Sequence, residues 1–441
     1  MSDETRLLHI EPGARHASAD IFSQLFGQRP AMIVADANTF AAAGRDVGDS
    51  FRRRMQPCLG PFVFAEDDLR AEYRHVEEIE RRLRETDAIA VAVGAGTIND
   101  LSKLAAHHLD RPYMVVATAA SMDGYSAFGA SMLRDGVKQT LPCPAPAAIV
   151  ADLQVIEAAP AELNAAGYAD LLAKVIAGAD WLLADALRVE SIHSEAWDMV
   201  QPGLREQLAD PAGVRSGRGD AIRGLLLGLL ASGLAMQRCQ SSRPASGAEH
   251  QFSHLWDTQG HTHQGRTPLH GFKVAVGTLA AAALYEQILS LRLEDLDGEE
   301  SCAAWPRWES VQSDIARRCD RPELIALALR ETQAKYVDAD QLRLRLKRLR
   351  DAWPSLRQRL QSQLMPWDEL RDRLRAAGCP THPEEIGISS ARLRDSHLPA
   401  YYIRRRFTVL DLAAQTGLFE ELLERMFGPE GRWPHQGGTA A

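Results

Sequence analysis

Short apolar runs alternate with longer amphipathic segments in the first third of the chain. Residues 88–93 form a continuous apolar run, which is typical of a strand buried on both faces of a sheet. Further strands are expected at 31–35, 62–64, 113–117, 137–141 and 149–152, with helices at 72–85 and 98–108. Strands that alternate with helices in this way predict an α/β domain with a mostly parallel, Rossmann-like sheet and right-handed crossovers.

The pattern changes after Pro160, where apolar residues begin to recur at helical spacing and continuous strand-like runs end. Helices are expected at 161–188, 192–204, 221–238 and 268–292, and again beyond 306. The basic run at 342–350 is interpreted as a solvated helix face, with an anion site as the alternative. We therefore predict an α/β domain over 1–155 and an all-helical domain over 156–441.

Composition limits the classes of function. The chain has 441 residues, of which 45% are hydrophobic and 25% charged, with a net charge of -9. This balance is typical of a soluble globular protein and argues against a general nucleic-acid binder. The six cysteines are scattered without a CxxC pair, which predicts reduced thiols in the cytoplasm. The run 224–236 is shorter than the ~20 residues that span a bilayer, so no membrane insertion is expected.

Histidines concentrate in one window of the helical half. Five of the 14 histidines fall between 250 and 270. On a helix, His250 and His254 lie on one face, and His270 follows shortly after. This pattern predicts a metal site, with a histidine-rich surface loop as the alternative. His261 and His263, in a loop rich in glycine, glutamine and threonine, are interpreted as substrate-loop or surface residues.

An aspartate offers the missing oxygen ligand. Asp170 lies in an otherwise apolar stretch and would either cap a helix or complete a ligand set with His250 and His270. Three protein ligands leave one position open on a metal, which is the pattern of catalytic sites rather than structural ones.

A glycine-containing turn follows the buried run 88–93. Glycines between a strand and a helix let the backbone approach a pyrophosphate, and the helix N-terminus attracts anions. We predict nucleotide contacts from this turn, and Asn99 and Asp100 have helix capping as their alternative. The predicted residues are Gly94, Gly96, Thr97, Ile98, Asn99 and Asp100.

Two other strand ends carry candidates for the cofactor. Asp36, at the end of the first predicted strand, would bind the adenosine ribose or cap a helix. The run Thr118, Ala119, Ala120 and Ser121 follows a later strand. Loops at the carboxyl ends of parallel strands line ligand sites, although an ordinary turn explains these residues equally well.

Together these segments resemble the sn-glycerol-1-phosphate dehydrogenases. That family belongs to the group of metal-dependent glycerol dehydrogenases, iron-containing alcohol dehydrogenases and dehydroquinate synthases. The motifs that carry the resemblance lie at 94–100, 118–124, 167–174, 246–254, 269–271 and 403–412. The resemblance implies a dehydroquinate synthase-like fold.

The resemblance also implies roles for individual residues. Gly96 to Asp100 would contact the nucleotide phosphates, and Thr118 to Ser121 would bind the dinucleotide. The metal ligands would be Asp170, His250 and His270. The catalytic and substrate-binding residues would be Asp123, where substrate and nicotinamide meet, and His254, with Asp170 also beside the substrate.

Two positions depart from the wider group. Lys174 stands where iron-dependent relatives carry a fourth ligand, a histidine. A protonated lysine cannot bind a metal, so a three-ligand site is expected. Ala127 stands where family members often carry serine, which removes one expected cofactor hydrogen bond.

The predicted function is metal-dependent reduction of dihydroxyacetone phosphate by NADH or NADPH to sn-glycerol 1-phosphate. Zinc is the expected metal, with nickel and iron as alternatives. Lys138, Arg266 and Lys273 are candidates for the substrate phosphate. The alternative functions are a dehydrogenase of an unphosphorylated polyol, a dehydroquinate synthase-like cyclase and a non-catalytic binding protein. The family resemblance further implies a homo-oligomer, a dimer or larger.

Overall fold

The chain forms two compact units that do not follow one another simply along the sequence. The computed structural model describes residues 4–66 and 68–434. The first unit contains residues 1–172, 195–245 and 376–379, and the second contains 173–194, 246–375 and 380–441. The chain therefore enters the second unit three times, at residues 173, 246 and 380, and returns to the first unit twice in between.

A six-stranded parallel sheet is the centre of the first unit. Its strand order is β1-β8-β5-β4-β2-β3, and every neighbouring pair is parallel. The strands are β1 Leu7–Glu11, β2 Ala31–Asp36, β3 Phe62–Phe64, β4 Ile89–Gly94, β5 Tyr113–Ala117 and β8 Ala148–Asp152. The continuous apolar run at 88–93 becomes β4, in which every residue is buried, as expected for a strand covered on both faces.

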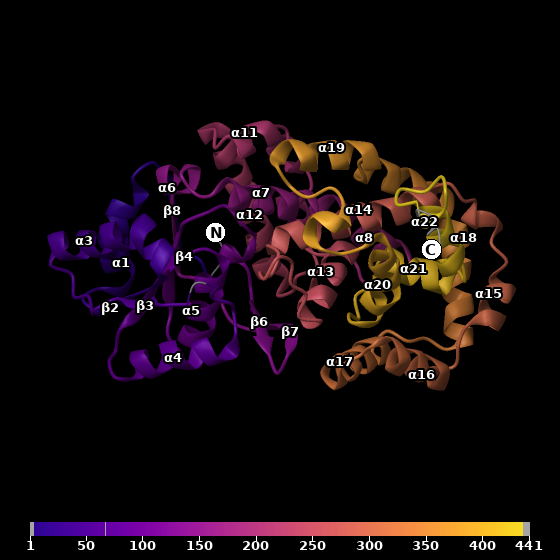
Figure 1. Ribbon diagram of the computed structural model, residues 1–441, viewed down its shortest axis with the longest axis horizontal. Coiled ribbons are helices and arrows are strands. Elements are labelled where there is room, and N and C mark those ends of the chain that lie inside the picture. The colour runs from indigo at the N-terminus through magenta and orange to yellow at the C-terminus, as the bar shows by residue number, and fades with distance from the viewer. Residues whose placement is uncertain (1–3, 67, 435–441) are drawn as a thin grey trace, which may run out of the picture. The chain divides into compact units, whose positions relative to one another are not determined.

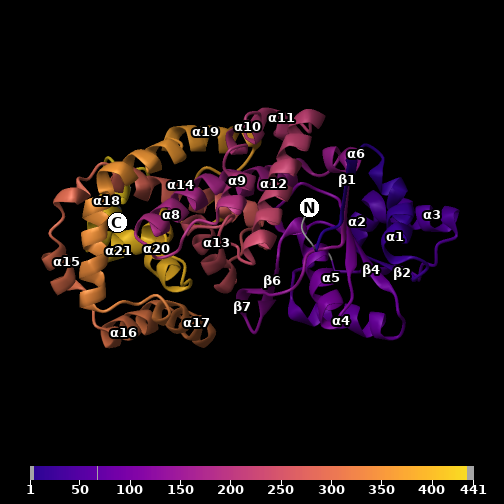
Figure 2. The same cartoon turned by 180° about the vertical axis from the view of Figure 1, so that it is seen from behind.

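Helices cover both faces of this sheet. Helices α1 (Ser18–Phe26) and α3 (Arg45–Arg54) pack on one face, where Phe22 and Phe51 share a core with Val91 and Val116. Helices α4 (Tyr73–Arg84) and α5 (Gly96–His108) lie side by side (Figures 1 and 2). The strand order reverses direction after β3, and right-handed crossovers therefore place α4 and α5 on the opposite face.

The rest of the first unit is a hairpin and a group of helices. Strands β6 (Ala130–Arg134) and β7 (Val137–Leu141) pair antiparallel, as the sequence predicted for 137–141. The other helices that lie in or mostly in this unit are α2 Ala37–Thr39, α6 Leu153–Glu157, α7 Ala161–Leu172, α9 Ser194–Val200, α10 Leu204–Gln207, α11 Pro211–Arg215 and α12 Gly219–Cys239.

Helices joined by loops make up the described residues of the second unit, and its one β-type pairing among them is an isolated bridge between His263 and Arg266. Its central helices α13 and α14 pack against each other (Figure 1). The helices in or mostly in this unit are α8 Lys174–Ala186, α13 Ala248–Thr258, α14 His270–Leu289, α15 Gly298–Ala304, α16 Trp308–Arg318, α17 Pro322–Gln333, α18 Ala339–Gln363, α19 Trp367–Ala377, α20 Ser390–Tyr402, α21 Val409–Gln415 and α22 Phe419–Phe427.

Two helices are long and apolar enough to cross a membrane by length and composition. They are α12 and α14, and the fold buries 56% and 78% of their apolar windows respectively. Core helices of folded proteins pass the same test, and the apolar run 224–236 lies within α12.

The structure confirms the predicted fold class and corrects several element boundaries. The segment 161–188 was expected to be one helix, but it forms α7 and α8, which are separated at Ala173 where the chain changes unit. The segment 192–204 was likewise expected to be a single helix and instead yields two short ones, α9 and α10. The predicted domain division near 155 follows the change from strands to helices and stays a prediction.

A glycine fixes the position of α7 in the first unit. A Cβ atom built on Gly167 would lie 1.7 Å from the carbonyl oxygen of Ala120. Because this neighbour is backbone, it cannot move aside like a flexible side chain. Gly167 therefore lets α7 approach the loop that follows β5.

We expect the substitution Gly167→Ala to lower the free energy of unfolding by about 1–3 kcal/mol through overpacking. Urea titration measures this change. Gly224→Ala in α12 is the matched control, because a Cβ there meets nothing within 4 Å. It should stabilise the helix by roughly 0.5–1 kcal/mol. Equal unfolding midpoints for Gly167→Ala and wild type would contradict the close approach.

Candidate active site

The turn after β4 presents the first backbone N–H groups of α5. Strand β4 ends at Gly94 and α5 begins at Gly96, as the sequence predicted. The first hydrogen bond of the helix runs from the Asn99 N–H to the Ala95 carbonyl, at 3.0 Å. The N–H groups of Gly96, Thr97 and Ile98 precede this bond and have no partner within the helix. Such N–H groups and the positive end of the helix dipole suit a phosphate.

The side chains of Asn99 and Asp100 hold a neighbouring loop. Asn99 accepts a hydrogen bond from the Tyr113 hydroxyl at 3.0 Å and donates to the Gly124 carbonyl at 3.3 Å. Asp100 accepts from the Ser131 N–H at 3.0 Å. Burial raises the pKa of Asp100, and the charge of Lys103 opposes this shift. These bonds give both side chains a structural role, and their predicted contact with phosphates stays a prediction.

Lys103 is a site residue that the sequence interpretation missed. Its ammonium group is buried and donates to the carbonyl oxygens of Gly124, Ala127 and Gly129 at 2.9, 2.9 and 3.1 Å. One charged side chain thus fixes the loop that follows Asp123. Its position in the middle of α5, one turn after Asn99, was the only signal in the sequence.

Asp36 forms the helix cap that was its alternative interpretation. Its Oδ1 accepts the Thr39 N–H at 2.9 Å, and the Thr39 hydroxyl accepts the Asp36 N–H at 3.1 Å. This is a capping box at the start of α2. Asp36 nevertheless ends β2, at the carboxyl edge of the sheet. Its role at a ribose is still a prediction.

The loop after β5 is tightly held. Thr118, Ala119 and Ala120 are buried. The Tyr125 hydroxyl donates to the Ala119 carbonyl at 2.8 Å, and the Ala120 N–H donates to Asn164 Oδ1 at 3.0 Å. Because this loop and the α5 N-terminus both follow neighbouring strands, β5 and β4, they lie at one edge of the sheet.

Asp123 and Asp170 meet within the first unit. The Asp123 N–H donates to Asp170 Oδ2 at 3.0 Å, and Asp123 Oδ2 accepts from the Ser232 hydroxyl at 2.9 Å. Asp170 is fully buried in the last turn of α7. The structure therefore brings the backbone of Asp123 to the carboxylate of Asp170, 47 positions further along the sequence. Ser232 is a partner of Asp123 that sequence reasoning missed.

The three predicted histidines cluster in the second unit. The ring centroids of His250 and His270 are 5.3 Å apart, and each lies 6.4 Å from the ring of His254. Helix α13 carries His250 and His254 one turn apart, and His270 is the first residue of α14. The structure thus replaces the surface-loop alternative with a mostly buried cluster.

A buried carboxylate orients the first of these histidines. Glu249 is 0% exposed. Its Oε1 lies 2.7 Å from His250 Nδ1 and 2.6 Å from the Gly247 N–H, which donates to it. A carboxylate accepts only, so His250 Nδ1 is the donor and Nε2 carries the lone pair. This arrangement is common for histidines that bind metals. The Ser253 hydroxyl lies 3.2 Å from His270 Nδ1 and is placed to fix the second ring.

Asp180 positions the start of the histidine-bearing helix. Asp180 is fully buried in α8. Its Oδ2 accepts the Ala248 N–H at 2.7 Å, and its Oδ1 accepts the Val409 N–H at 2.8 Å and the Tyr285 hydroxyl at 2.6 Å. The sequence showed only an aspartate in an apolar helix, and sequence reasoning did not identify it.

His254 accepts a hydrogen bond from an arginine. Arg404 Nη2 lies 3.0 Å from His254 Nε2. Because a guanidinium only donates, His254 Nε2 is the acceptor and the proton of the neutral ring is on Nδ1. Arg404 lies in the motif 403–412, but no role was predicted for it.

The remaining candidates are placed less centrally. His261 is buried, donates to the Ile386 carbonyl at 2.7 Å and accepts from Arg392 at 2.9 Å. It is therefore not a surface residue, and burial lowers its pKa. Among the phosphate candidates, Lys273 forms an ion pair with Asp257, Lys138 donates to the Ser131 carbonyl, and Arg266 is exposed.

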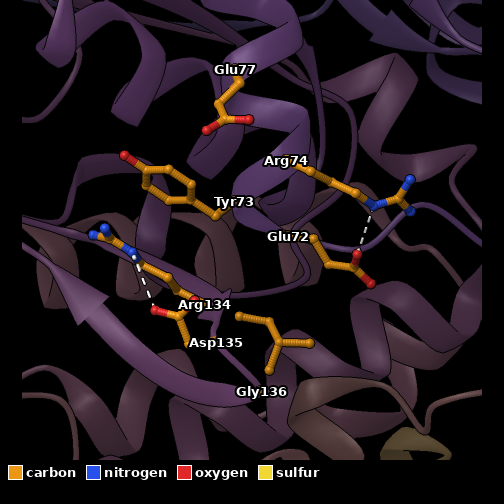
Figure 3. Close-up of a pocket in the computed structure, with 8 residues that line it drawn as sticks. Glu72, Tyr73, Arg74, Glu77, Arg134, Asp135 and Gly136 are labelled. Atoms are coloured by element: carbon orange, nitrogen blue, oxygen red, sulfur yellow. Dashed lines mark hydrogen bonds and ion pairs between the residues drawn. The ribbon is translucent and has the colours of Figure 1, made fainter.

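A separate surface pocket lies where the N-terminus of α4 meets the β6–β7 hairpin (Figure 3). Its charges pair among themselves: Arg74 with Glu72 at 2.8 Å and Arg134 with Asp135 at 3.7 Å. The Arg134 guanidinium also lies 4.4 Å from the centre of the Tyr73 ring. None of the predicted cofactor, metal or substrate residues is among those that line this pocket.

The donor set fits a divalent metal. Two histidines within one cluster, one of them held by a buried carboxylate, and an aspartate give two nitrogen donors and one oxygen donor. Zinc accepts this combination, and three protein ligands leave a position for substrate.

Comparisons with known proteins agree with this fold. The family model for iron-containing alcohol dehydrogenases matches residues 9–160. A probable glycerol dehydrogenase from Sinorhizobium meliloti 1021 has a similar fold, with a TM-score of 0.61 and 17% identity over 95% of this chain and 96% of that chain. Maleylacetate reductase from Agrobacterium tumefaciens gives a TM-score of 0.62 with 16% identity over 98% of each chain.

Curated relatives are more similar in sequence. Glycerol-1-phosphate dehydrogenase, NAD(P)+, from Halalkalibacterium halodurans is 36% identical over 272 residues, which is 61% of this chain and 68% of the relative. The protein of the same name from Pyrococcus furiosus is 31% identical over 269 residues, 61% of this chain and 75% of the relative.

The fold and the matched family define the class of this protein, which is an NAD(P)-linked alcohol dehydrogenase of the iron-containing alcohol dehydrogenase group. Within that class, the chain belongs to the glycerol-1-phosphate dehydrogenase family. The resemblance drawn from the motifs is thereby confirmed.

We expect Glu249→Gln to weaken metal binding by about 10–100-fold, because the variant loses the charge that orients His250 and raises its basicity. Competition for zinc with a chromophoric chelator measures the dissociation constant without any turnover. Glu309→Gln, which removes an exposed carboxylate in α16, is the control and should bind as wild type does. Unchanged affinity in Glu249→Gln would contradict the role of Glu249.

Proposed function

We propose that this protein reduces dihydroxyacetone phosphate to sn-glycerol 1-phosphate with NADH or NADPH and one divalent metal ion. One observation carries the proposal: a chain of this family retains an aspartate and two histidines with the donor atoms of a catalytic three-ligand site. The relatives' names supply the substrate, and the donor set supplies the chemistry.

We propose Asp170, His250 and His270 as the metal ligands. A bound divalent metal supplies Lewis-acid polarisation of the substrate oxygen, which is worth several kcal/mol in the transition state. Zinc is the metal we propose, with nickel and iron as alternatives that the same donors accept. The hydrogen bond that His250 Nδ1 donates to Glu249 supports the proposal, because it leaves Nε2 as the atom that can bind the metal.

The first unit supports binding of the dinucleotide. The N–H groups at the start of α5 are suited to the pyrophosphate, and the loop 118–121 lies at the same edge of the sheet. Bound NAD(P)H supplies the hydride. We propose that Asp36 binds the ribose with the carboxylate oxygen that does not cap α2, which favours NAD over NADP because a 2′-phosphate would meet a negative charge.

Two residues are proposed beside the substrate. Asp123 is held through its N–H by Asp170 and through its carboxylate by Ser232. Its position is therefore set before substrate arrives. His254 either relays a proton or orients the substrate. The bond from Arg404 favours orientation, because the nitrogen that would take up a proton already accepts from a guanidinium.

We further propose that the protein is a homo-oligomer, as the family resemblance implies. We also propose that it is cytoplasmic, because its scattered cysteines indicate reduced thiols. Light scattering of the purified protein reports its mass in solution. A monomer at micromolar concentration would contradict the proposed oligomer.

The direct test is oxidation of NADH in the presence of dihydroxyacetone phosphate. Wild type should be active, and chelation should abolish the rate. His250→Ala should lose about a thousandfold in rate, because several kcal/mol of transition-state stabilisation depend on the metal. Chiral analysis of the product should find sn-glycerol 1-phosphate.

His193→Ala is the matched control for this test, since His193 is an exposed histidine of the same unit. It should keep the wild-type rate. If no phosphorylated or free ketone supports oxidation despite bound metal and cofactor, the proposal fails and a cyclase that uses the cofactor transiently becomes the better hypothesis. If free ketones react as well as phosphorylated ones, the protein is a polyol dehydrogenase.

A further inference from the structure

Three consecutive arginines follow α20, and they have different partners. Arg405 binds both oxygens of Glu331, each at 2.9 Å. Arg406 donates to the carbonyl and the hydroxyl of Ser246, each at 2.6 Å. These bonds hold Arg405 and Arg406, and with them the loop that follows α20. Arg404 instead donates to the neutral nitrogen of His254.

Arg404 is a partly buried cation without a directly bonded anion. Burial lowers the pKa of Arg404, and the charge of Glu331 opposes this shift. A guanidinium keeps its proton in spite of such shifts. Among the hydrogen bonds and ion pairs of the described residues, none joins Arg404 to a carboxylate, and both oxygens of Glu331 bind Arg405. Even partial burial of a charge costs free energy, and pairing with an anion offsets that cost.

The anion site would be adjacent to the histidine cluster. Arg404 contacts His254 directly, and the His254 ring lies 6.4 Å from those of His250 and His270. A substrate whose ketone oxygen lies at the cluster carries its phosphate only a few bonds further along a three-carbon chain. A planar guanidinium with several free donors matches phosphate oxygens in a bidentate way.

We propose that Arg404 binds the phosphate of the substrate and is the specificity-determining residue for phosphorylated over free ketones. This inference rests on the function proposed above. It also replaces the earlier candidates for this role, since Lys273 is already neutralised by Asp257. The bond to His254 then couples recognition of the phosphate to the orientation of the histidine beside the ketone.

The test compares two substrates and three variants. Arg404→Met removes the charge, Arg404→Lys keeps the charge without the fork, and Arg405→Met removes a neighbouring charge from the same loop. For dihydroxyacetone phosphate, kcat/KM should fall roughly 30-fold or more in Arg404→Met, mainly through KM. Arg404→Lys should recover part of this loss. For free dihydroxyacetone, kcat/KM should change far less in all three variants.

A merely structural role for Arg404 predicts a different pattern. Loss of His254 orientation would lower kcat with both ketones by the same factor, and that equal loss would overturn the inference. Arg405→Met should affect the two ketones alike, if at all. Circular dichroism of each variant checks that the loop substitutions leave the helical content unchanged.

Binding of inorganic phosphate separates this inference from the proposed function. Titration calorimetry on the zinc-loaded protein should detect phosphate binding in wild type and Arg405→Met and not in Arg404→Met. If wild type fails to reduce dihydroxyacetone phosphate but shows this binding pattern, the proposed reaction falls and the anion site stands. If Arg404→Met binds phosphate as wild type does, the inference is wrong.

Discussion

The second unit depends on one buried carboxylate. Asp180 binds the first N–H groups of α13 and α21 and the hydroxyl of Tyr285 on α14. A negative charge at two helix N-termini is favoured by both dipoles. It also satisfies donors that burial would otherwise leave unpaired, at a cost of about 1–3 kcal/mol each. Helix α13 carries His250 and His254, and Arg404 lies shortly before α21. The positions of all three side chains therefore follow from Asp180.

The first unit reaches the same rigidity by other means. Glycines let helices approach loops closely: Gly167 meets the Ala120 carbonyl, and a Cβ on Gly233 would lie 2.6 Å from the Asp123 carbonyl. Lys103 then binds three carbonyl oxygens of the following loop. In this unit, backbone groups are the partners that decide where Asp123 and Asp170 lie. In the helical unit a buried side chain, the carboxylate of Asp180, has that role.

The sequence predicted what depends on local pattern. Continuous apolar runs identified β2, β4 and β5 because strands buried on both faces leave no other pattern, and the spacing of His250 and His254 on one helix face was equally local. Strand β1 was missed because its residues are only half buried and lack such a run. Asp180 and Lys103 were missed because their partners lie far away, for example 229 positions from Asp180 to Val409. No pattern within a helix reveals such partners. Asp170 was joined to His250 and His270 as one of two interpretations of a lone aspartate in an apolar stretch, and the motif resemblance then favoured the ligand set over the helix cap.

The long separation between Asp180 and its partners has a consequence for synthesis on the ribosome. Asp180 emerges in α8, but Ala248 follows 68 residues later and Val409 229 residues later. The sheet-bearing unit lies almost wholly before residue 246, with only residues 376–379 still to come, so nearly all of its chain exists when most of the helical unit has not been made. Helix α8 must therefore remain without its final partners until the last segment is translated. In a nascent chain that stops before residue 409, Asp180 still lacks the N–H of Val409, one of its hydrogen-bond donors. Synthesis of the C-terminal segment is therefore the step that completes the surroundings of Asp180.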